Sequence, residues 1–211
     1  MNTVTTSLNI PALINRTKLV ALNPKTCWDT VAADVTPPNE LTKKFVLPLV
    51  VLGGLATVIG LQVFGITVPN LGTWRPGFFS SLFQQVLTVV MMIVSFYVNA
   101  LVMSKLAAQF KGNISYERAF SLEIHAALPA LAIGLLAIVP WIPVFLGLPL
   151  GIYSLYLLFQ GARRMVTIQQ ERFVAFFIVY VVVSVLVSFL AMSVVSPLTP
   201  SPFSDLGSIG Q

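Results

Sequence analysis

The sequence predicts an all-α polytopic membrane protein with five transmembrane helices, and three observations support this fold class. Of the 211 residues, 56% are hydrophobic and only 9% are charged, with a mean hydropathy of +0.89, whereas a soluble domain is about one-quarter charged. Five apolar runs are each near the ~20 residues that an α-helix needs to cross ~30 Å of hydrocarbon. Lys and Arg collect in alternate segments between these runs, as in loops that stay on one side of a membrane.

Residues 1–44 are predicted to form a cytoplasmic segment, because they contain no stretch apolar enough to span the membrane. Met1–Ser7 is polar and lacks the basic start of a cleavable signal peptide, so the first span is expected to act as an uncleaved insertion signal. One helical face within residues 10–21 is apolar, which suits a short helix lying in the head-group region or packed under the bundle. That face consists of Ile10, Leu13, Ile14, Thr17 and Ala21.

A second short interfacial helix is predicted over Thr26–Ala33, after the break at Asn23-Pro24. Trp28 is expected to anchor it at the membrane interface, where the amphipathic indole ring is favoured. Cys27 is the single cysteine, so no intrachain disulfide can form, and its thiol is expected to stay reduced on the cytoplasmic side.

The apolar runs define a transmembrane domain over residues 45–195, followed by a tail, residues 196–211, that is expected to be disordered because it is rich in Pro, Ser and Gly. The third and fourth runs are nearly continuous. Pro140 and Pro143, with Trp141 between them, are typical of a tight hairpin at the outer interface. One long kinked helix is the alternative, but about forty residues are too many for a single crossing. The predicted spans are Phe45–Ile66, Leu82–Ala107, Ala119–Val139, Trp141–Gln160 and Phe173–Val195.

The distribution of positive charge predicts the orientation. Among the 12 basic residues only Arg75 falls on the side opposite the N-terminus, and positive charge near helix ends is retained in the cytoplasm. The N-terminus is therefore expected inside and the C-terminus outside the inner (cytoplasmic) membrane. Anionic head groups account for the net charge of +5 without a nucleic-acid partner. The inner basic residues are Arg16, Lys18, Lys25, Lys43, Lys44, Lys105, Lys111, Arg118, Arg163, Arg164 and Arg172.

Small residues recur at helical spacing on four of the spans, which predicts close helix crossings in a compact five-helix bundle. The faces are Gly53, Ala56, Thr57 and Gly60 on the first span, Glu123, Ala127, Ala130, Gly134 and Ala137 on the third, Gly147, Gly151 and Ser154 on the fourth, and Ser184, Ser188 and Ala191 on the fifth.

The second span has a polar stripe that should face the bundle interior or a wet cavity, because unpaired polar groups are costly in lipid. Three interpretations fit it: interhelical hydrogen bonding, a path for a substrate or lipid, and an interface with another protomer. The stripe consists of Ser81, Gln84, Thr88, Met92, Ser95 and Asn99.

Glu123 and His125 are the ionisable pair within a predicted span, and such groups are functional candidates. Their i, i+2 spacing turns them to nearly opposite helix faces. Glu123 is expected about one turn from the cytoplasmic end, where it can snorkel or pair with Arg118, Arg163 or Arg164. Pro129 removes the intrahelical partner of the His125 carbonyl, which leaves an acceptor for a cation, a head group or a hydroxyl. Both structural and functional roles fit these residues.

The sequence contains no motif of a common enzyme class. There is no HExxH zinc motif and no GxSxG nucleophile elbow. One histidine and one distant cysteine do not suggest a metal site. We therefore expect no enzyme activity and no cofactor.

Three passages resemble the Yip1 family of five-helix membrane proteins. The first is Leu19–Trp28, with Pro24-Lys25 before the tryptophan. The second begins at Ser115-Tyr116-Glu117-Arg118 and reaches Pro129. The third is Tyr153–Gly161, with the pattern Tyr-x-x-Tyr-Leu-Leu, followed by Arg163 and Arg164. The resemblance covers Leu19 to Val195.

The resemblance implies a membrane protein without catalytic residues to transfer. Eukaryotic members associate with small GTPases in vesicle traffic, but the chain has no Asp-Leu-Tyr-Gly-Pro-type motif before its first span, so no GTPase partner is expected. The expected function is interaction with anionic lipid head groups, a membrane-protein partner or a second copy of the chain. Glu123, His125, Pro129, Arg163 and Arg164 are its candidate surface. The alternative is a small transporter or channel that uses Gln84, Thr88, Ser95 and Asn99.

Overall fold

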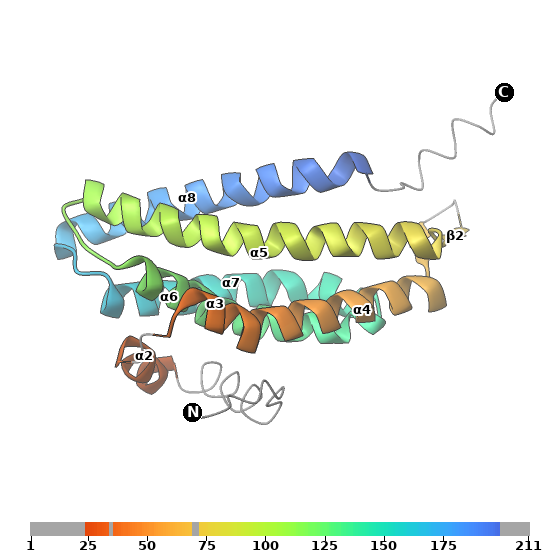
Figure 1. Cartoon of the computed structure of the whole chain (residues 1–211), viewed down its shortest axis with the longest axis horizontal. Coiled ribbons are helices and arrows are strands. Elements are labelled where there is room, and N and C mark those ends of the chain that lie inside the picture. The colour runs from red at the N-terminus through yellow and green to blue at the C-terminus, as the bar shows by residue number, and fades with distance from the viewer. Residues whose placement is uncertain (1–23, 34–35, 69–71, 199–211) are drawn as a thin grey trace, which may run out of the picture.

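The computed structural model describes residues 24–33, 36–68 and 72–198, and within them the chain is a bundle of long helices (Figure 1). Five helices are long and apolar enough to cross a membrane, as predicted. These are Pro38–Val63, made of α3 (Pro38–Leu41), the π-helical turn η1 (Thr42–Val46) and α4 (Leu47–Val63); α5 (Phe78–Gln109); Tyr116–Ile138, made of α6 (Tyr116–Gly134) and the 3-10 turn η2 (Leu135–Ile138); α7 (Trp141–Met165); and α8 (Gln170–Val195).

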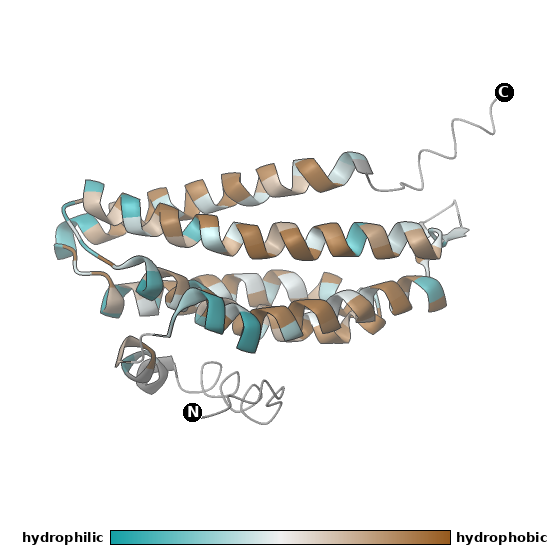
Figure 2. Cartoon of the chain, in the orientation of Figure 1, coloured by the Kyte–Doolittle hydropathy of each residue, from teal (hydrophilic) through white to brown (hydrophobic). Residues whose placement is uncertain are grey.

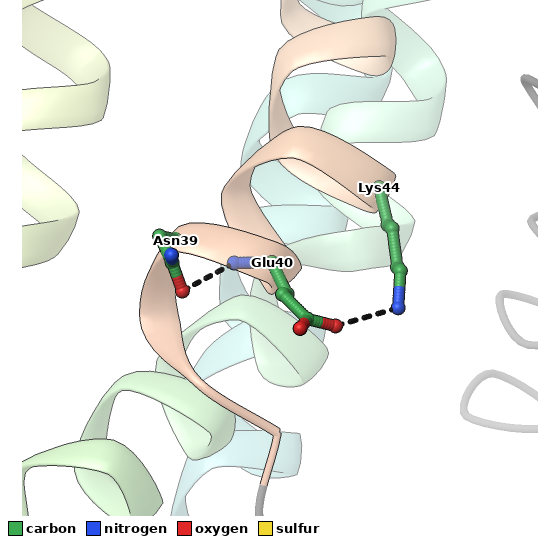
Figure 3. A network of polar contacts seen from close by, with 3 residues as sticks. All are labelled: Asn39, Glu40 and Lys44. Carbon is green, nitrogen blue, oxygen red and sulfur yellow. Dashed lines mark hydrogen bonds and ion pairs between the residues drawn. The ribbon is translucent and has the colours of Figure 1, made fainter. Parts of the chain in front are cut away.

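Most of these helices extend beyond the apolar runs into polar sequence. The first span begins at Pro38, where the side chain of Asn39 accepts a hydrogen bond of 2.9 Å from the Glu40 amide and Lys44 forms an ion pair of 2.7 Å with Glu40 (Figure 3). The third begins after Ser115, whose hydroxyl accepts a hydrogen bond of 3.4 Å from the Arg118 amide. Hydropathy alone places these starts too late, because helix-forming polar residues continue each helix outside the apolar region.

A short hairpin replaces the predicted end of the first span. Gly65 adopts φ +69°, which ends the helix, since this left-handed conformation favours glycine. Ile66 then begins β1 (Ile66–Val68), which pairs antiparallel with β2 (Gly72–Trp74) in the register Ile66↔Trp74. The prediction that the helix reaches Ile66 is therefore wrong.

Two of the small-residue faces form a close crossing of the predicted kind, and the structure shows that it joins α4 to the third span. A Cβ atom built on Gly53 would lie 3.2 Å from the backbone carbon of Gly134. One built on Gly60 would lie 2.5 Å from the backbone oxygen of Ala137. Only residues without larger side chains allow backbones to approach so closely.

The small-residue faces of α7 and α8 do not form close crossings. A Cβ atom on Gly147 or Gly151 would meet nothing within 4 Å, and Ser184 and Ser188 line a groove. The reason is the arrangement of the bundle: α7 packs against α6, and α8 packs against α5 on the other side (Figure 1). The prediction that the small-residue faces of the fourth and fifth spans each make a close helix crossing is therefore wrong.

One end of the bundle collects the charged side chains, and we call it the charged end. Figure 2 shows hydrophilic residues gathered toward this end and along the start of the first span, near α2 (Pro24–Ala33), while most of α4 and α8 is hydrophobic. Asn113 and Thr167 join its two connecting loops through backbone hydrogen bonds of 2.8 and 3.0 Å. The basic residues at this end are Lys43, Lys44, Lys105, Lys111, Arg118, Arg163, Arg164 and Arg172, whereas Arg75 lies at the opposite end.

The structure describes only parts of the two chain ends. The helix expected within residues 10–21 lies outside the described residues, as do residues 199–211 of the predicted tail. The second short helix is present as α2. Ser196–Leu198, assigned to the tail, forms a 3-10 turn (η3) that continues α8.

Candidate functional site

Glu123 lies inside the bundle and is bound by a residue from another helix. Its side chain is 8% exposed, and its Oε1 accepts a hydrogen bond from the hydroxyl of Tyr180 on α8, which is 1% exposed. Within the described ranges no Lys or Arg forms an ion pair with Glu123. The expectation that it snorkels or pairs with Arg118, Arg163 or Arg164 is therefore wrong. At 1.5 Å per residue, it lies ~10 Å along α6 from Tyr116.

Glu123 and Tyr180 form part of the wall of a groove between α7 and α8. Its volume is about 390 Å³. Leu155 and Leu158 line it from α7, while Ser184 and Met192 line it from α8 beyond Tyr180. Tyr180 is not among the predicted site residues, although it is a polar interruption in the valine-rich run of α8.

Aromatic side chains join α7 and α8 near the charged end. The Phe159 ring of α7 lies 5.4 Å from the Phe173 ring and 5.0 Å from the Phe177 ring, both on α8. Phe110, at the end of α5, lies 6.0 Å from Phe176. The groove therefore begins beyond this aromatic contact and runs along α8 toward Met192.

His125 faces away from Glu123, as their spacing predicts. Its side chain is 1% exposed, and its Nδ1 lies 2.7 Å from the backbone oxygen of Ser121. The imidazole centroid is 6.3 Å from the ring of Phe45 at the start of the first span. Pro129 is buried within α6, which continues as an α-helix to Gly134. Glu123, His125 and Pro129 are thus interior residues, separate from the exposed arginines.

The two arginines at the end of α7 have different surroundings. Arg164 forms an ion pair with Asp29 of α2. The guanidinium of Arg163 instead lies over two rings, 5.2 Å from the centroid of Phe159 and 5.8 Å from that of Phe173. Arg163 also borders a cavity of about 330 Å³ with Ile168 and Gln170 in its wall.

Trp28 attaches α2 to the bundle. Its side chain is 1% exposed, and a Cβ atom on Gly161 of α7 would lie 2.9 Å from two carbons of its indole ring and in contact with Leu122 of α6. The absence of a side chain at Gly161 creates the space that the indole occupies. The prediction of Trp28 as an anchor in the membrane interface is wrong, because the ring is enclosed by the protein.

The polar stripe of α5 lines a second groove, between α5 and α8, with a volume of about 390 Å³. Thr88 donates to the backbone oxygen of Gln84 at 2.9 Å, and Ser95 donates to that of Met91 at 2.8 Å. These hydroxyl groups are satisfied within their own helix, so they do not join helices. Asn99 is 9% exposed, and its Oδ1 has no hydrogen-bond partner among the described residues. The residues of the stripe in this groove are Gln84, Thr88, Met92, Ser95 and Asn99.

Ser81, the first residue of the stripe, does join two helices. It is 2% exposed, and its hydroxyl accepts a hydrogen bond of 3.4 Å from the side-chain nitrogen of Gln62 on α4. Gln62 also donates to the backbone oxygen of Pro76 at 3.0 Å. Interhelical hydrogen bonding therefore accounts for Ser81, while the rest of the stripe faces a groove.

No group of three or more His, Cys, Asp or Glu residues in the described segments is arranged to hold a metal ion. Three settings combine a polar group with a groove or cavity: Glu123 with Tyr180, Arg163, and Asn99. Among the described residues, Trp28 Nε1, Ser154 Oγ and Ser184 Oγ are also buried without a hydrogen-bond partner.

Comparison with known proteins identifies the family. A family model described as the Yip1 domain matches residues 18–192, which include all three of these settings. No curated protein and no solved structure matches the chain. The family match covers most of the 211 residues and confirms the resemblance seen in the sequence. The chain is an integral, multi-pass membrane protein, and it belongs to the Yip1 family.

Proposed function

We propose that the chain is a non-enzymatic protein of the cell inner membrane that binds anionic lipid head groups at its charged end, with this end in the cytoplasm. The charge pattern supports this orientation. In the described part of the chain the Lys and Arg residues lie at the charged end, except for Arg75 at the opposite end, and positive charge near helix ends is retained in the cytoplasm. The setting of Arg163 is the observation that favours lipid binding.

Arg163 has the features of a phosphate ligand. It is exposed and forms no ion pair with another described residue. The rings of Phe159 and Phe173 hold its guanidinium through cation–π contacts, which reduces the entropy lost on binding. The adjoining cavity of about 330 Å³ offers room for a head group. A planar guanidinium can donate two parallel hydrogen bonds to a phosphate, which gives both affinity and orientation.

Arg164 has a different role in this proposal. Its ion pair with Asp29 links α7 to α2, so its loss affects the attachment of α2 as well as the surface charge. Neutralising both arginines together would mix these two effects. Arg163 should therefore be tested alone.

The test measures lipids retained by the full chain after release from bilayers that contain phosphatidylglycerol and phosphatidylethanolamine. Native mass spectrometry of the parent protein should show preferential retention of phosphatidylglycerol. Arg163→Gln should lower that retention roughly tenfold, as expected for a lost charge-assisted contact. Arg118→Gln is the matched control, because it removes an exposed charge at the same end away from the cavity. Equal retention by Arg163→Gln and the parent would refute the proposal.

Transport is the second candidate function, and the groove lined by the polar stripe favours it. A solute path needs polar groups that face a cavity rather than lipid. In proteoliposomes, Gln84→Leu and Asn99→Leu should each reduce the flux of a transported solute. Unchanged flux in both folded variants would exclude this path.

A further inference from the structure

The groove between α7 and α8 is an apolar cavity with a single buried acid. Its volume of about 390 Å³ is within the range of small-molecule sites. Leucine, valine, phenylalanine and methionine side chains form most of its wall. Its polar residues are Glu123 and three hydroxyl-bearing residues of α8, namely Tyr180, Ser184 and Ser188.

Glu123 lacks a positively charged partner in this groove. Tyr180 satisfies one carboxyl oxygen, but the part of the chain that the structure describes supplies no Lys or Arg to the acid. Burial of a carboxylate without a counter-ion is costly, and an opposite charge with hydrogen bonds reduces that cost. Charge complementarity therefore favours a cationic ligand at Glu123.

Ser184 supplies an independent sign of a polar ligand. Its Oγ is buried and has no hydrogen-bond partner within residues 24–33, 36–68 and 72–198. Ser184 follows Tyr180 by one helical turn on α8 and lines the same groove. A primary ammonium has three N–H donors, which match a carboxylate and a hydroxyl oxygen on neighbouring walls.

The depth and lining of the groove define the rest of the ligand. Glu123 lies ~10 Å along α6 from Tyr116, where this helix begins, and Phe159 joins α7 to α8 between the groove and Arg163. A ligand therefore enters from the hydrocarbon region, where a phosphate-bearing head group is disfavoured. We infer that this groove binds a lipophilic primary amine. Its ammonium contacts Glu123 and Ser184, and its alkyl chain lies along Leu155, Val185 and Met192.

The inference goes beyond the anionic-lipid proposal and depends on different residues. The test uses radiolabelled dodecylamine, with dodecanol as the uncharged probe, on the full chain in phosphatidylcholine nanodiscs; binding to empty nanodiscs is subtracted. Dodecylamine should bind saturably and more tightly than dodecanol. Glu123→Gln should weaken it roughly 30-fold or more, because it leaves the ammonium without its opposite charge. The amide keeps an oxygen acceptor for Tyr180, which favours folding of this variant.

Three further variants complete the test. Ser184→Ala should weaken dodecylamine binding by roughly fivefold through loss of one hydrogen bond. Leu155→Trp should block the groove, whereas Leu148→Trp is the matched control, since Leu148 is 72% exposed on α7 and does not line it.

Arg163→Gln should leave amine binding unchanged, so failure of either proposal is distinguishable from failure of the other. Equal binding of dodecanol and dodecylamine, or undiminished amine binding by folded Glu123→Gln, would overturn the inference. If Glu123→Gln does not fold, undiminished binding by both Ser184→Ala and Leu155→Trp would overturn it.

Discussion

The indole of Trp28 occupies the space left by the missing side chain of Gly161, so a tryptophan from α2 and a glycine from α7 form one joint. Residues 133 positions apart thus determine whether the N-terminal helix stays attached to the bundle. Asp29 and Arg164 form an ion pair beside this joint. This ion pair is exposed, with 69% of the Asp29 side chain and 39% of the Arg164 side chain accessible. Exposed ion pairs contribute little to the free energy of folding. Burial of the indole is the larger contribution to the joint.

Gly161→Ala should detach α2. A Cβ atom at this position would lie 2.9 Å from the indole, and such overpacking costs about 1–3 kcal/mol. The measurement is iodide quenching of Trp28 fluorescence in a Trp74→Phe, Trp141→Phe background, where Trp28 is the remaining tryptophan of three. Quenching should increase in Gly161→Ala and stay unchanged in Gly151→Ala, whose Cβ meets open space. Equal protection in both variants would show that the joint tolerates a side chain.

The crossing of α4 over the third span should be less tolerant than this joint. A Cβ atom on Gly60 would lie 2.5 Å from the Ala137 oxygen and 2.7 Å from the Ile138 oxygen. These are backbone atoms, which cannot move aside as a side chain can, so Gly60→Ala should cost about 3 kcal/mol or more. Gly147→Ala, in open space, should be neutral or stabilise by up to about 1 kcal/mol through helix propensity. Unfolding in mixed micelles would measure both, and similar stabilities would contradict the predicted difference.

The comparison of these glycines shows what hydrophobic patterning can predict. The number of spans follows from apolar length alone, and each of the five predicted runs corresponds to a helix. The spacing of small residues indicates which face of a helix can approach another helix closely, but not whether another helix lies opposite that face. Gly53 and Gly60 meet the third span, whereas Gly147 and Gly151 face open space within the described part of the chain. The assignment of neighbours depends on the packing of the whole bundle.

The site residues show the same limit. The spacing of Glu123 and His125 correctly predicts that they face different neighbours. The partner of Glu123 is 57 residues away on α8, and no local pattern links the two. Trp28 follows a statistical preference of tryptophan for the membrane interface, which the specific cavity above Gly161 overrides. The hairpin of β1 and β2 was not predicted, because its strands have only three residues each.

The hydrogen bond between Tyr180 and Glu123 should stabilise the bundle. Tyr180→Phe leaves the buried carboxyl without this donor, so the free energy of unfolding should fall by about 1–3 kcal/mol. Tyr156→Phe is the matched control, because its hydroxyl bonds Gln160 at the surface and its loss should change stability by less than about 0.5 kcal/mol.

A double substitution separates this hydrogen bond from packing. Replacing both partners by apolar groups of similar shape can be nearly neutral. Glu123→Met combined with Tyr180→Phe should therefore recover most of the stability that Tyr180→Phe loses. A double variant that is less stable than Tyr180→Phe alone would show that the tyrosine acts through packing rather than through its hydroxyl.

Asn99 allows a structural role of the polar stripe to be distinguished from a functional one. Its Oδ1 is buried, and no described residue donates a hydrogen bond to it; such an unpaired acceptor costs about 1–3 kcal/mol. Asn99→Leu should therefore keep or raise the free energy of unfolding, measured in mixed micelles. Ser81→Leu is the contrasting variant, because it removes a bond to Gln62 and overfills a buried site, and it should destabilise the protein. If Asn99→Leu also destabilises the fold, then the Asn99 amide has a structural partner. A reduced solute flux in the Asn99→Leu variant would then no longer indicate a transport path. A stable Asn99→Leu variant with reduced flux would instead show that the chain retains this amide for function at a cost in stability.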